Sequence, residues 1–263
     1  MGALYNLHKV NPLDYCFNSL SVRLLCLGPE NAEYNLIHQY IQRGYNRYTK
    51  GCVANIFAVE RKGEVERISQ WRHLKNRMYL WHGSKVSNMM SILNQGLRVA
   101  PSEASSTGAR FGKGIYFADM FEKAYSYSQD YVANREKIPF KTVFLCEVAL
   151  GEKLELDTVQ YVDELDRINC LFPIIKDLIA QYKSVLGRGR KGPNMEQQIV
   201  LVNGAKVPIG DIINYEYWRK GENGELERVH PECTHNEYIV YDISQVRMRY
   251  IIQVHCLAFF WIS

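Results

Sequence analysis

Three short segments of the chain combine ionisable or aromatic side chains with glycine or with an apolar run. They are residues 79–84 (YLWHGS), 108–122 (GARFGKGIYFADMFE) and 235–242 (HNEYIVYD). Glycine has no Cβ, so its backbone can approach a flat ligand closely. Histidine, tyrosine, lysine and glutamate can exchange protons or hydrogen bonds with such a ligand. The three segments therefore predict a site that closes around a planar ligand and performs polar chemistry on it.

In this order and at this spacing, the three segments resemble the catalytic domain of the poly(ADP-ribose) polymerases. The resemblance covers about residues 10–263 and is weakest at 157–194 and 218–234. It implies an α+β ADP-ribosyltransferase fold with two antiparallel β-sheets and short flanking helices. It also implies that NAD is the donor substrate and that a protein side chain or a growing ADP-ribose chain is the acceptor.

Glu237 is the candidate catalytic carboxylate. Cleavage of the bond between nicotinamide and ribose passes through an oxocarbenium-like state, and a carboxylate beside the sugar can stabilise that transient charge. Nicotinamide leaves as a neutral molecule, so one glutamate suffices without a general acid. The alternative is a solvated glutamate at the start of a strand, which the two other segments disfavour.

Four residues are candidates for holding the nicotinamide half of NAD. By resemblance, His82 contacts a ribose hydroxyl, and the backbone of Gly83 binds the nicotinamide carboxamide. Tyr116 is the second member of the family's His-Tyr-Glu set, and Tyr127 stacks on the nicotinamide ring, where an aromatic side chain binds without adding charge. A satisfied core histidine and a tyrosine packed in the core are the alternatives for His82 and Tyr116.

Further polar residues match positions of the family outside the nicotinamide pocket. Ser84, Asn88 and Arg98 correspond to residues that line the adenosine side of NAD. Lys123 corresponds to a basic residue near the active site that helps to hold the acceptor or the pyrophosphate. For Arg98, a structural ion pair is an equal alternative.

Two positions depart from the family pattern. Ala124 stands where the family commonly has a serine that hydrogen-bonds the nicotinamide carboxamide. Ala109 stands where the family has an aromatic residue in the loop over the donor. Both departures predict a lower affinity for NAD rather than a different reaction.

The composition favours one principal domain and an intracellular protein. The chain has 263 residues, 47% of them hydrophobic, which is enough to bury one large core. Its net charge of +4 is too small, and its basic residues too scattered, to predict a nucleic-acid-binding surface. Its seven scattered cysteines include no C-x-x-C pair and predict reduced thiols.

The two ends of the chain do not predict membrane attachment. The start resembles a myristoylation signal only until position 6, which is Asn6 instead of serine or threonine. The apolar residues 250–261 are fewer than a membrane span needs and include Gln253 and His255. We therefore expect a buried strand there and no membrane partner.

The sequence disfavours both a metal site and a polyanion site. His230, Cys233 and His235 lie in one short segment, but no second set of ligands accompanies them, so we expect no metal. Arg188 and Arg190 lie in the Gly/Arg-rich residues 187–193, which predict a solvated surface loop rather than a contact with a polyanion.

The pattern of apolar and turn residues predicts an α+β domain in which strands outnumber helices. The predicted elements are helices over 13–27, 33–41 and 86–95, the last ended by Gly96, a hairpin over 52–67, strands over 78–81, 144–150 and 237–246, and an apolar helical patch over 168–182 at a sheet edge.

The resemblance divides the chain into two parts. Residues 1–30 would be a remnant of a helical regulatory subdomain, represented by its last helix, and residues 31–263 would be the catalytic domain. The chain would then be either a minimal transferase or a fragment of a protein with upstream modules that contact nucleic acid. The family further implies a nuclear location and a role in the response to DNA damage.

Three functions remain open for the chain. It could elongate ADP-ribose chains on acceptor proteins, act as a mono-ADP-ribosyltransferase or NAD glycohydrolase, or bind NAD or ADP-ribose without catalysis. The presence of His82, Tyr116 and Glu237 disfavours the third function. Glu237 favours elongation, since it can also act as a general base on an acceptor hydroxyl.

Overall fold

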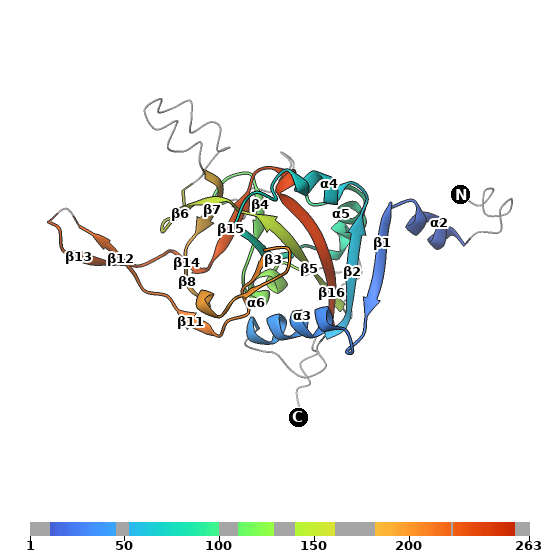
Figure 1. Ribbon diagram of the computed structural model, residues 1–263, viewed down its shortest axis with the longest axis horizontal. Coiled ribbons are helices and arrows are strands. Elements are labelled where there is room, and N and C mark those ends of the chain that lie inside the picture. The colour runs from blue at the N-terminus through green and yellow to red at the C-terminus, as the bar shows by residue number, and fades with distance from the viewer. Residues whose placement is uncertain are drawn as a thin grey trace, which may run out of the picture.

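The computed structural model describes residues 11–45, 53–99, 110–128, 140–160, 182–221 and 223–255. Their main element is a seven-stranded sheet (Figure 1). Its strands are, in spatial order, β1 (Val22–Leu27), β2 (Val53–Arg61), β16 (Val246–His255), β5 (Phe140–Ala149), β3 (Arg77–Gly83), β10 (Lys206–Val207) and β9 (Ile199–Val200).

Smaller sheets accompany the large sheet within the described residues. A four-stranded sheet contains β4 (Ile115–Phe117), β15 (Glu237–Val240), β7 (Tyr182–Gly187) and β6 (Glu152–Leu156). A three-stranded sheet contains β11 (Ile212–Asn214), β8 (Gly189–Pro193) and β14 (Cys233–His235). The hairpin of β12 (Tyr217–Lys220) and β13 (Leu226–Val229) pairs only with itself among the described strands and extends away from the body (Figure 1).

The helices are short. Asn31 caps the longest described helix by accepting a hydrogen bond from the backbone of Glu33, as N-cap residues typically do. No helix in the described ranges is long and apolar enough to span a membrane. The described α-helices are α2 (Pro12–Asn18), α3 (Ala32–Arg43), α4 (Glu64–Ser69), α5 (Met89–Gln95) and α6 (Phe121–Ser126). The described 3₁₀ turns are η1 (Val86–Asn88), η2 (Met195–Gln197) and η3 (Ile243–Gln245).

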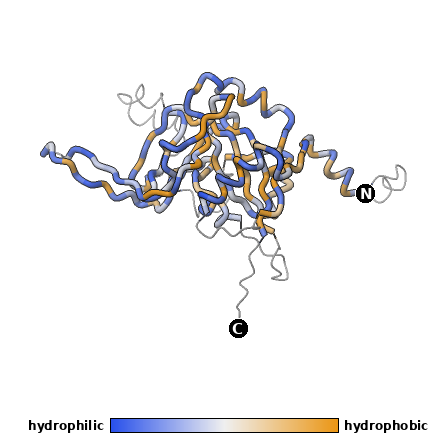
Figure 2. Tube along the Cα trace, turned by 60° about the horizontal axis from the view of Figure 1, so that its bottom comes forward, coloured by the Kyte–Doolittle hydropathy of each residue, from blue (hydrophilic) through white to orange (hydrophobic). Residues whose placement is uncertain are grey.

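The core lies on both faces of the large sheet. Side chains of β5 alternate between the two faces, as the period of a strand requires. Phe144, Cys146 and Val148 join one apolar cluster, and Val143 and Leu145 join the other. The first cluster continues into β4 and β15, so the two main sheets pack against each other, and the second continues into α3 and α6. Hydrophobic stretches accordingly gather inside the body (Figure 2).

The predicted α+β architecture is confirmed, as are four of its elements. The helices predicted over 33–41 and 86–95 correspond to α3 and to η1 with α5, which ends at Gly96 with a φ of 83°. The strands predicted over 78–81 and 144–150 correspond to β3 and β5. Most strand pairs are antiparallel, with parallel pairing of β10 with β3, β14 with β8 and β6 with β7.

The first predicted helix was wrong over its second half. Helix α2 ends at Asn18, and Ser21 then takes a φ of 51° before the chain enters β1. Strand β1 pairs with β2 over its whole length, from Val22 opposite Arg61 onward. The leucines of this segment are spaced as in a helix, but the pairing with β2 outweighs that local preference. The division of the chain at residue 30 stays a prediction.

Three other local predictions need correction. Only the first arm of the predicted hairpin is a strand, because Gly63 takes a φ of 82° and starts α4. The strand predicted over 237–246 ends at Val240 and is followed by η3. The predicted surface loop over 187–193 consists of the end of β7 and of β8. The patch predicted over 168–182 lies outside the described residues except for its last residue, which begins β7, and the C-terminal strand is described only to His255.

Candidate active site

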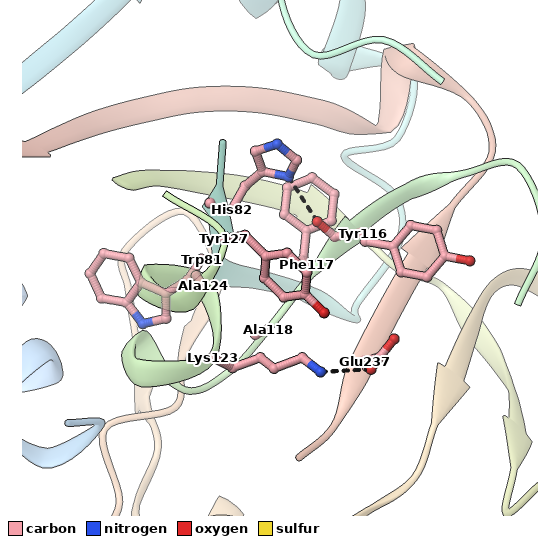
Figure 3. A pocket seen from close by; sticks show the side chains of 10 residues that line it. Trp81, His82, Tyr116, Phe117, Ala118, Lys123, Ala124, Tyr127 and Glu237 are labelled. Carbon is pink, nitrogen blue, oxygen red and sulfur yellow. Dashed lines mark hydrogen bonds and ion pairs between the residues drawn. The ribbon is translucent and has the colours of Figure 1, made fainter. Parts of the chain in front are cut away.

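A cavity of about 190 Å³ lies where the end of β3 meets β4, α6 and β15 (Figure 3). Three segments far apart in the sequence thus converge on one space, and they are the three segments singled out by their chemistry. The residues that line the cavity are Trp81, His82, Gly83, Tyr116, Phe117, Ala118, Lys123, Ala124, Tyr127 and Glu237.

His82 is held by the neighbouring strand. Its Nδ1 lies 2.8 Å from the carbonyl oxygen of Tyr116 and donates a hydrogen bond to it. Burial lowers the pKa of His82, and the bond to Tyr116 opposes this only in part. The ring is therefore neutral near pH 7, and its Nε2 carries the lone pair that can accept a hydrogen bond.

Gly83 is required by the packing of α6 on β3. A Cβ at this position would overlap the backbone carbonyl oxygen of Ala124 and lie 3.1 Å from the Cβ of Tyr127. Any side chain would therefore push α6 away from the strand. The close approach also keeps Ala124 and Tyr127 beside the backbone of Gly83 within the cavity wall.

Tyr116 lines the cavity, and its hydroxyl group holds another segment. The hydroxyl donates to the carbonyl of Gly112 at 2.7 Å and accepts from the backbone N–H of Phe111 at 2.9 Å. Gly112 takes a φ of 93°, which favours glycine. Tyr116 thus fixes the segment before β4 through its hydroxyl group.

Lys123 and Glu237 form an ion pair across the cavity. The Nζ of Lys123 lies 2.8 Å from Oε1 of Glu237, whose residue is only 4% exposed. Burial alone would lower the pKa of Lys123, but the hydrogen bond and charge of Glu237 outweigh it and raise the pKa. The lysine is therefore a cation, and it offers a counter-charge to an otherwise buried carboxylate.

Tyr127 presents an open aromatic ring. It is 55% exposed, and the Nζ of Lys123 lies 5.6 Å from its ring centre. In the view of Figure 3, this ring lies between His82 on one side and the Lys123–Glu237 pair on the other. A planar ligand can stack on such a ring, since aromatic faces attract other flat rings.

Comparisons with known proteins show the family of the chain. The family model of the poly(ADP-ribose) polymerase catalytic domain matches residues 31–256. The chain belongs to this family. Members of the family are ADP-ribosyltransferases that take NAD as a substrate.

The chain is similar over nearly its whole length to poly(ADP-ribose) polymerases of animals and plants. It is 32% identical to poly(ADP-ribose) polymerase of Drosophila melanogaster over 93% of the chain and 22% of that protein. It is 35% identical to poly(ADP-ribose) polymerase 2 of Arabidopsis thaliana over 93% of the chain and 34% of that protein. It is 37% identical to poly(ADP-ribose) polymerase 2-A of Oryza sativa subsp. japonica over 93% of the chain and 33% of that protein. The chain thus spans about a third of these relatives or less.

Three residues matched to the adenosine side of NAD do not line the cavity. Ser84 follows Gly83, and its hydroxyl accepts a hydrogen bond from Asn88 at 3.1 Å. Arg98 is exposed, bonds to Gln95 at 3.4 Å, and forms no ion pair with another described residue. Their contact with NAD stays a prediction, and Ala109 lies outside the described residues.

The sequence did not single out three residues of the cavity wall. Trp81, Phe117 and Ala118 belong to the same segments as the predicted polar residues, but their apolar type suggested core packing. In the structure they form an apolar part of the cavity wall. Their direct adjacency to His82 and Tyr116 is the signal that could have found them.

The structure describes the residues that are candidates for metal and for polyanion binding. The described residues contain no group of three His, Cys, Asp or Glu side chains that could hold a metal. Arg188 forms ion pairs with Glu155 at 2.6 Å and Asp157 at 3.3 Å. Arg190 donates a hydrogen bond to Thr234 at 3.1 Å. Both arginines therefore bind within the protein.

Proposed function

We propose that this chain cleaves the bond between nicotinamide and ribose in NAD, transfers ADP-ribose to protein side chains and elongates the product to poly(ADP-ribose). The observation that carries this proposal is the Lys123–Glu237 ion pair in one cavity with the ring of Tyr127 and the backbone of Gly83. The same cavity thus offers the ring of Tyr127 for stacking on nicotinamide and the carboxylate of Glu237 for the ribose.

The nicotinamide half of NAD is bound by three groups in this proposal. The ring stacks on Tyr127, and the carboxamide pairs with the backbone of Gly83. The neutral His82 accepts a hydrogen bond from a ribose hydroxyl through Nε2, because its Nδ1 is already bound to Tyr116. These contacts orient the substrate without adding charge next to the leaving ring.

Glu237 acts at two points of the reaction. When the C–N bond between ribose and nicotinamide breaks, the electron pair of that bond leaves with nicotinamide. The carboxylate of Glu237 stabilises the positive charge that develops on the ribose. The acceptor oxygen then bonds to the anomeric carbon and loses its proton, which Glu237 takes as a general base. Lys123 holds the carboxylate in position for both steps and keeps a cation near the acceptor.

The test replaces Glu237 by glutamine and follows labelled NAD on a gel. Turnover should fall by about 100- to 1000-fold, since one interaction with transition-state charge is removed. NAD affinity should change little, because the lost charge acts mainly after the ground state. The matched control is Glu225→Gln, at an exposed position directly before β13. A Glu237→Gln variant that elongates chains at the wild-type rate would exclude this role.

The same gel separates the possible products. A smear indicates elongation, a single shifted band indicates mono-ADP-ribosylation, and free ADP-ribose alone indicates NAD hydrolysis. The proposed partners are acceptor proteins and ADP-ribose chains. The proposed location is the nucleus, and nucleic acid would be contacted only through other segments of a longer protein.

A further inference from the structure

The residues on either side of Glu237 are bound to a single carboxylate oxygen. Asn236 donates a hydrogen bond from Nδ2 to Oδ2 of Asp119 at 2.7 Å, and the hydroxyl of Tyr238 donates to the same oxygen at 3.1 Å. Asp119, Asn236 and Tyr238 are 0%, 4% and 2% exposed. Successive side chains of a strand point to opposite faces, so binding residues 236 and 238 on one face fixes the direction of Glu237 on the other.

Two further hydrogen bonds hold this arrangement. Oδ1 of Asn236 accepts from the backbone N–H of Gly189 in β8 at 2.8 Å. The backbone carbonyl of Asp119 accepts from the hydroxyl of Tyr40 in α3 at 3.0 Å. Both ends of the Asp119–Asn236 bond are therefore attached to separate elements of the fold, which leaves the pair little freedom to move.

Asp119 lies within the segment that forms the opposite wall of the cavity, although its own side chain is buried behind that wall. It follows Tyr116 by three positions and precedes Lys123 by four, at the junction of β4 and α6. One carboxylate thus ties the segment that carries Tyr116 and Lys123 to the strand that carries Glu237. The 2.8 Å separation of Lys123 and Glu237 depends on how these two walls are joined.

We propose that Asp119 is a positioning residue for the transferase reaction, which sets the place of Glu237 through Asn236 and Tyr238. The proposal rests on the function proposed above for Glu237. Asp119 does not line the cavity, so it acts on the reaction only through other residues. Its effect is on the geometry of the catalytic carboxylate.

The chemistry of Asp119 supports a functional use. Burial raises its pKa to about 6, although the bonds from Asn236 and Tyr238 favour the charged form. Burying a carboxylate is costly, and an apolar core of the same volume is often at least as stable. A core that served only stability would not need this group.

The experiment compares turnover in Asp119→Ala and Asp119→Asn. The alanine variant loses both bonds, and a shift of the carboxylate by about 1 Å should lower kcat about 100-fold. KM for NAD and the affinity for nicotinamide should stay near the wild-type values, because Gly83 and Tyr127 lie outside the network. The asparagine variant keeps one side-chain oxygen that can accept the bonds from Asn236 and Tyr238. Its amide nitrogen takes the place of Oδ1, which bonds to no other described residue. Its kcat should therefore be within about fivefold of the wild-type value, unlike that of the alanine variant.

Controls separate positioning from stability. Ser184→Ala removes a buried hydroxyl bond, to the carbonyl of Leu150 at 2.8 Å, in the same sheet without touching Asp119. It should lower the melting temperature and leave kcat unchanged. If Asp119→Ala does not fold, Tyr238→Phe removes one of the two donors with little change in volume, and should lower kcat at constant KM.

A second readout does not depend on turnover. Hydrogen exchange of peptides covering residues 233–240 should be faster in Asp119→Ala, or in Tyr238→Phe if the alanine variant does not fold, and unchanged in Ser184→Ala. If the wild-type protein shows no turnover, the proposed function is refuted, and hydrogen exchange still tests the role of Asp119. A wild-type kcat in folded Asp119→Ala, or unchanged exchange in that variant, would overturn the role of Asp119. If Tyr238→Phe is the variant tested, a wild-type kcat or unchanged hydrogen exchange in it would also overturn the role of Asp119.

Discussion

Ala124 leaves the cavity wall without a hydroxyl group at the point where α6 packs against β3. The residue is 3% exposed and lies beside the backbone of Gly83. The nearest serine along the helix does not replace the missing group, because Ser126 is exposed and donates to the carbonyl of Lys123 at 2.6 Å. A carboxamide bound at Gly83 therefore lacks one donor from α6.

Replacing Ala124 by serine should tighten the binding of nicotinamide and of benzamide-type inhibitors by about fivefold, as one neutral hydrogen bond adds on the order of 1 kcal/mol. The turnover number should change less, since the bond already exists before the transition state. Calorimetric titration of both ligands measures the effect. Ser126→Ala is the matched control and should bind like the wild type. Equal or weaker binding by Ala124→Ser would mean that this side chain does not meet the carboxamide.

Individual site residues could be predicted where their role depends on near neighbours in the sequence. Gly83 follows His82 directly, and the pattern around Tyr116 already suggested a ligand pocket. The use of the Tyr116 hydroxyl could not be predicted, because it depends on how residues 111–112 turn back toward β4. The same holds for Asp119 and Asn236, which are 117 positions apart.

Strand β8 controls how close the three-stranded sheet comes to β15, the strand that begins with Glu237. It pairs in parallel with β14, which leads directly to Glu237. A Cβ at Gly189 would overlap the backbone of His235 and Asn236, so the contact is between two main chains. The glycine is thus required by packing between elements, as expected where two backbones meet.

Gly189→Ala should separate β8 from β14, with a loss of about 1–3 kcal/mol in the free energy of unfolding, the typical cost of overpacking. It should also lower turnover, since Asn236 loses its bond to residue 189. Gly221→Ala is the matched control: its Cβ would meet only the flexible carboxylate of Glu227, so stability should stay within about 0.5 kcal/mol. Urea unfolding with parallel assays tests this, and wild-type stability of Gly189→Ala would contradict the packing argument.

The elements that sequence patterns missed are those defined by their partners. Residues 187–193 are rich in glycine and arginine, which suggests a solvated loop. However, Gly189 allows close strand pairing, and Arg188 is bound by Glu155. Strand β1 has leucines at nearly helical spacing, and its pairing with β2 decides its conformation. Strands β3 and β5 were predictable because both their faces are buried, which gives continuous apolar runs.

Over the whole molecule, buried ionisable groups make stability depend on pH in opposite directions. Burial, with smaller effects of Lys191 and Lys123, lowers the pKa of His235 to about 4, and burial also lowers the pKa of His82. The folded protein then binds fewer protons than the unfolded chain below pH 6.5, so stability falls as the pH is lowered from about 6.5 to 4. The raised pKa of Asp119 has the reverse effect between about pH 6 and 4.

These opposing effects predict how substitutions change the pH dependence of unfolding. His235→Gln should flatten the decline of the free energy of unfolding between pH 6.5 and 4.5, because a group that must stay neutral in the fold is removed. Asp119→Asn should steepen the decline, because it removes the group that gains a proton in the fold over this range. Urea unfolding at half-unit pH intervals measures both slopes, which remain comparable even if a variant is less stable overall. His73→Gln, at an exposed position, should keep the wild-type slope. A wild-type slope in His235→Gln would show that this histidine takes up protons equally in both states, and its burial would then have no part in the acid sensitivity of the fold.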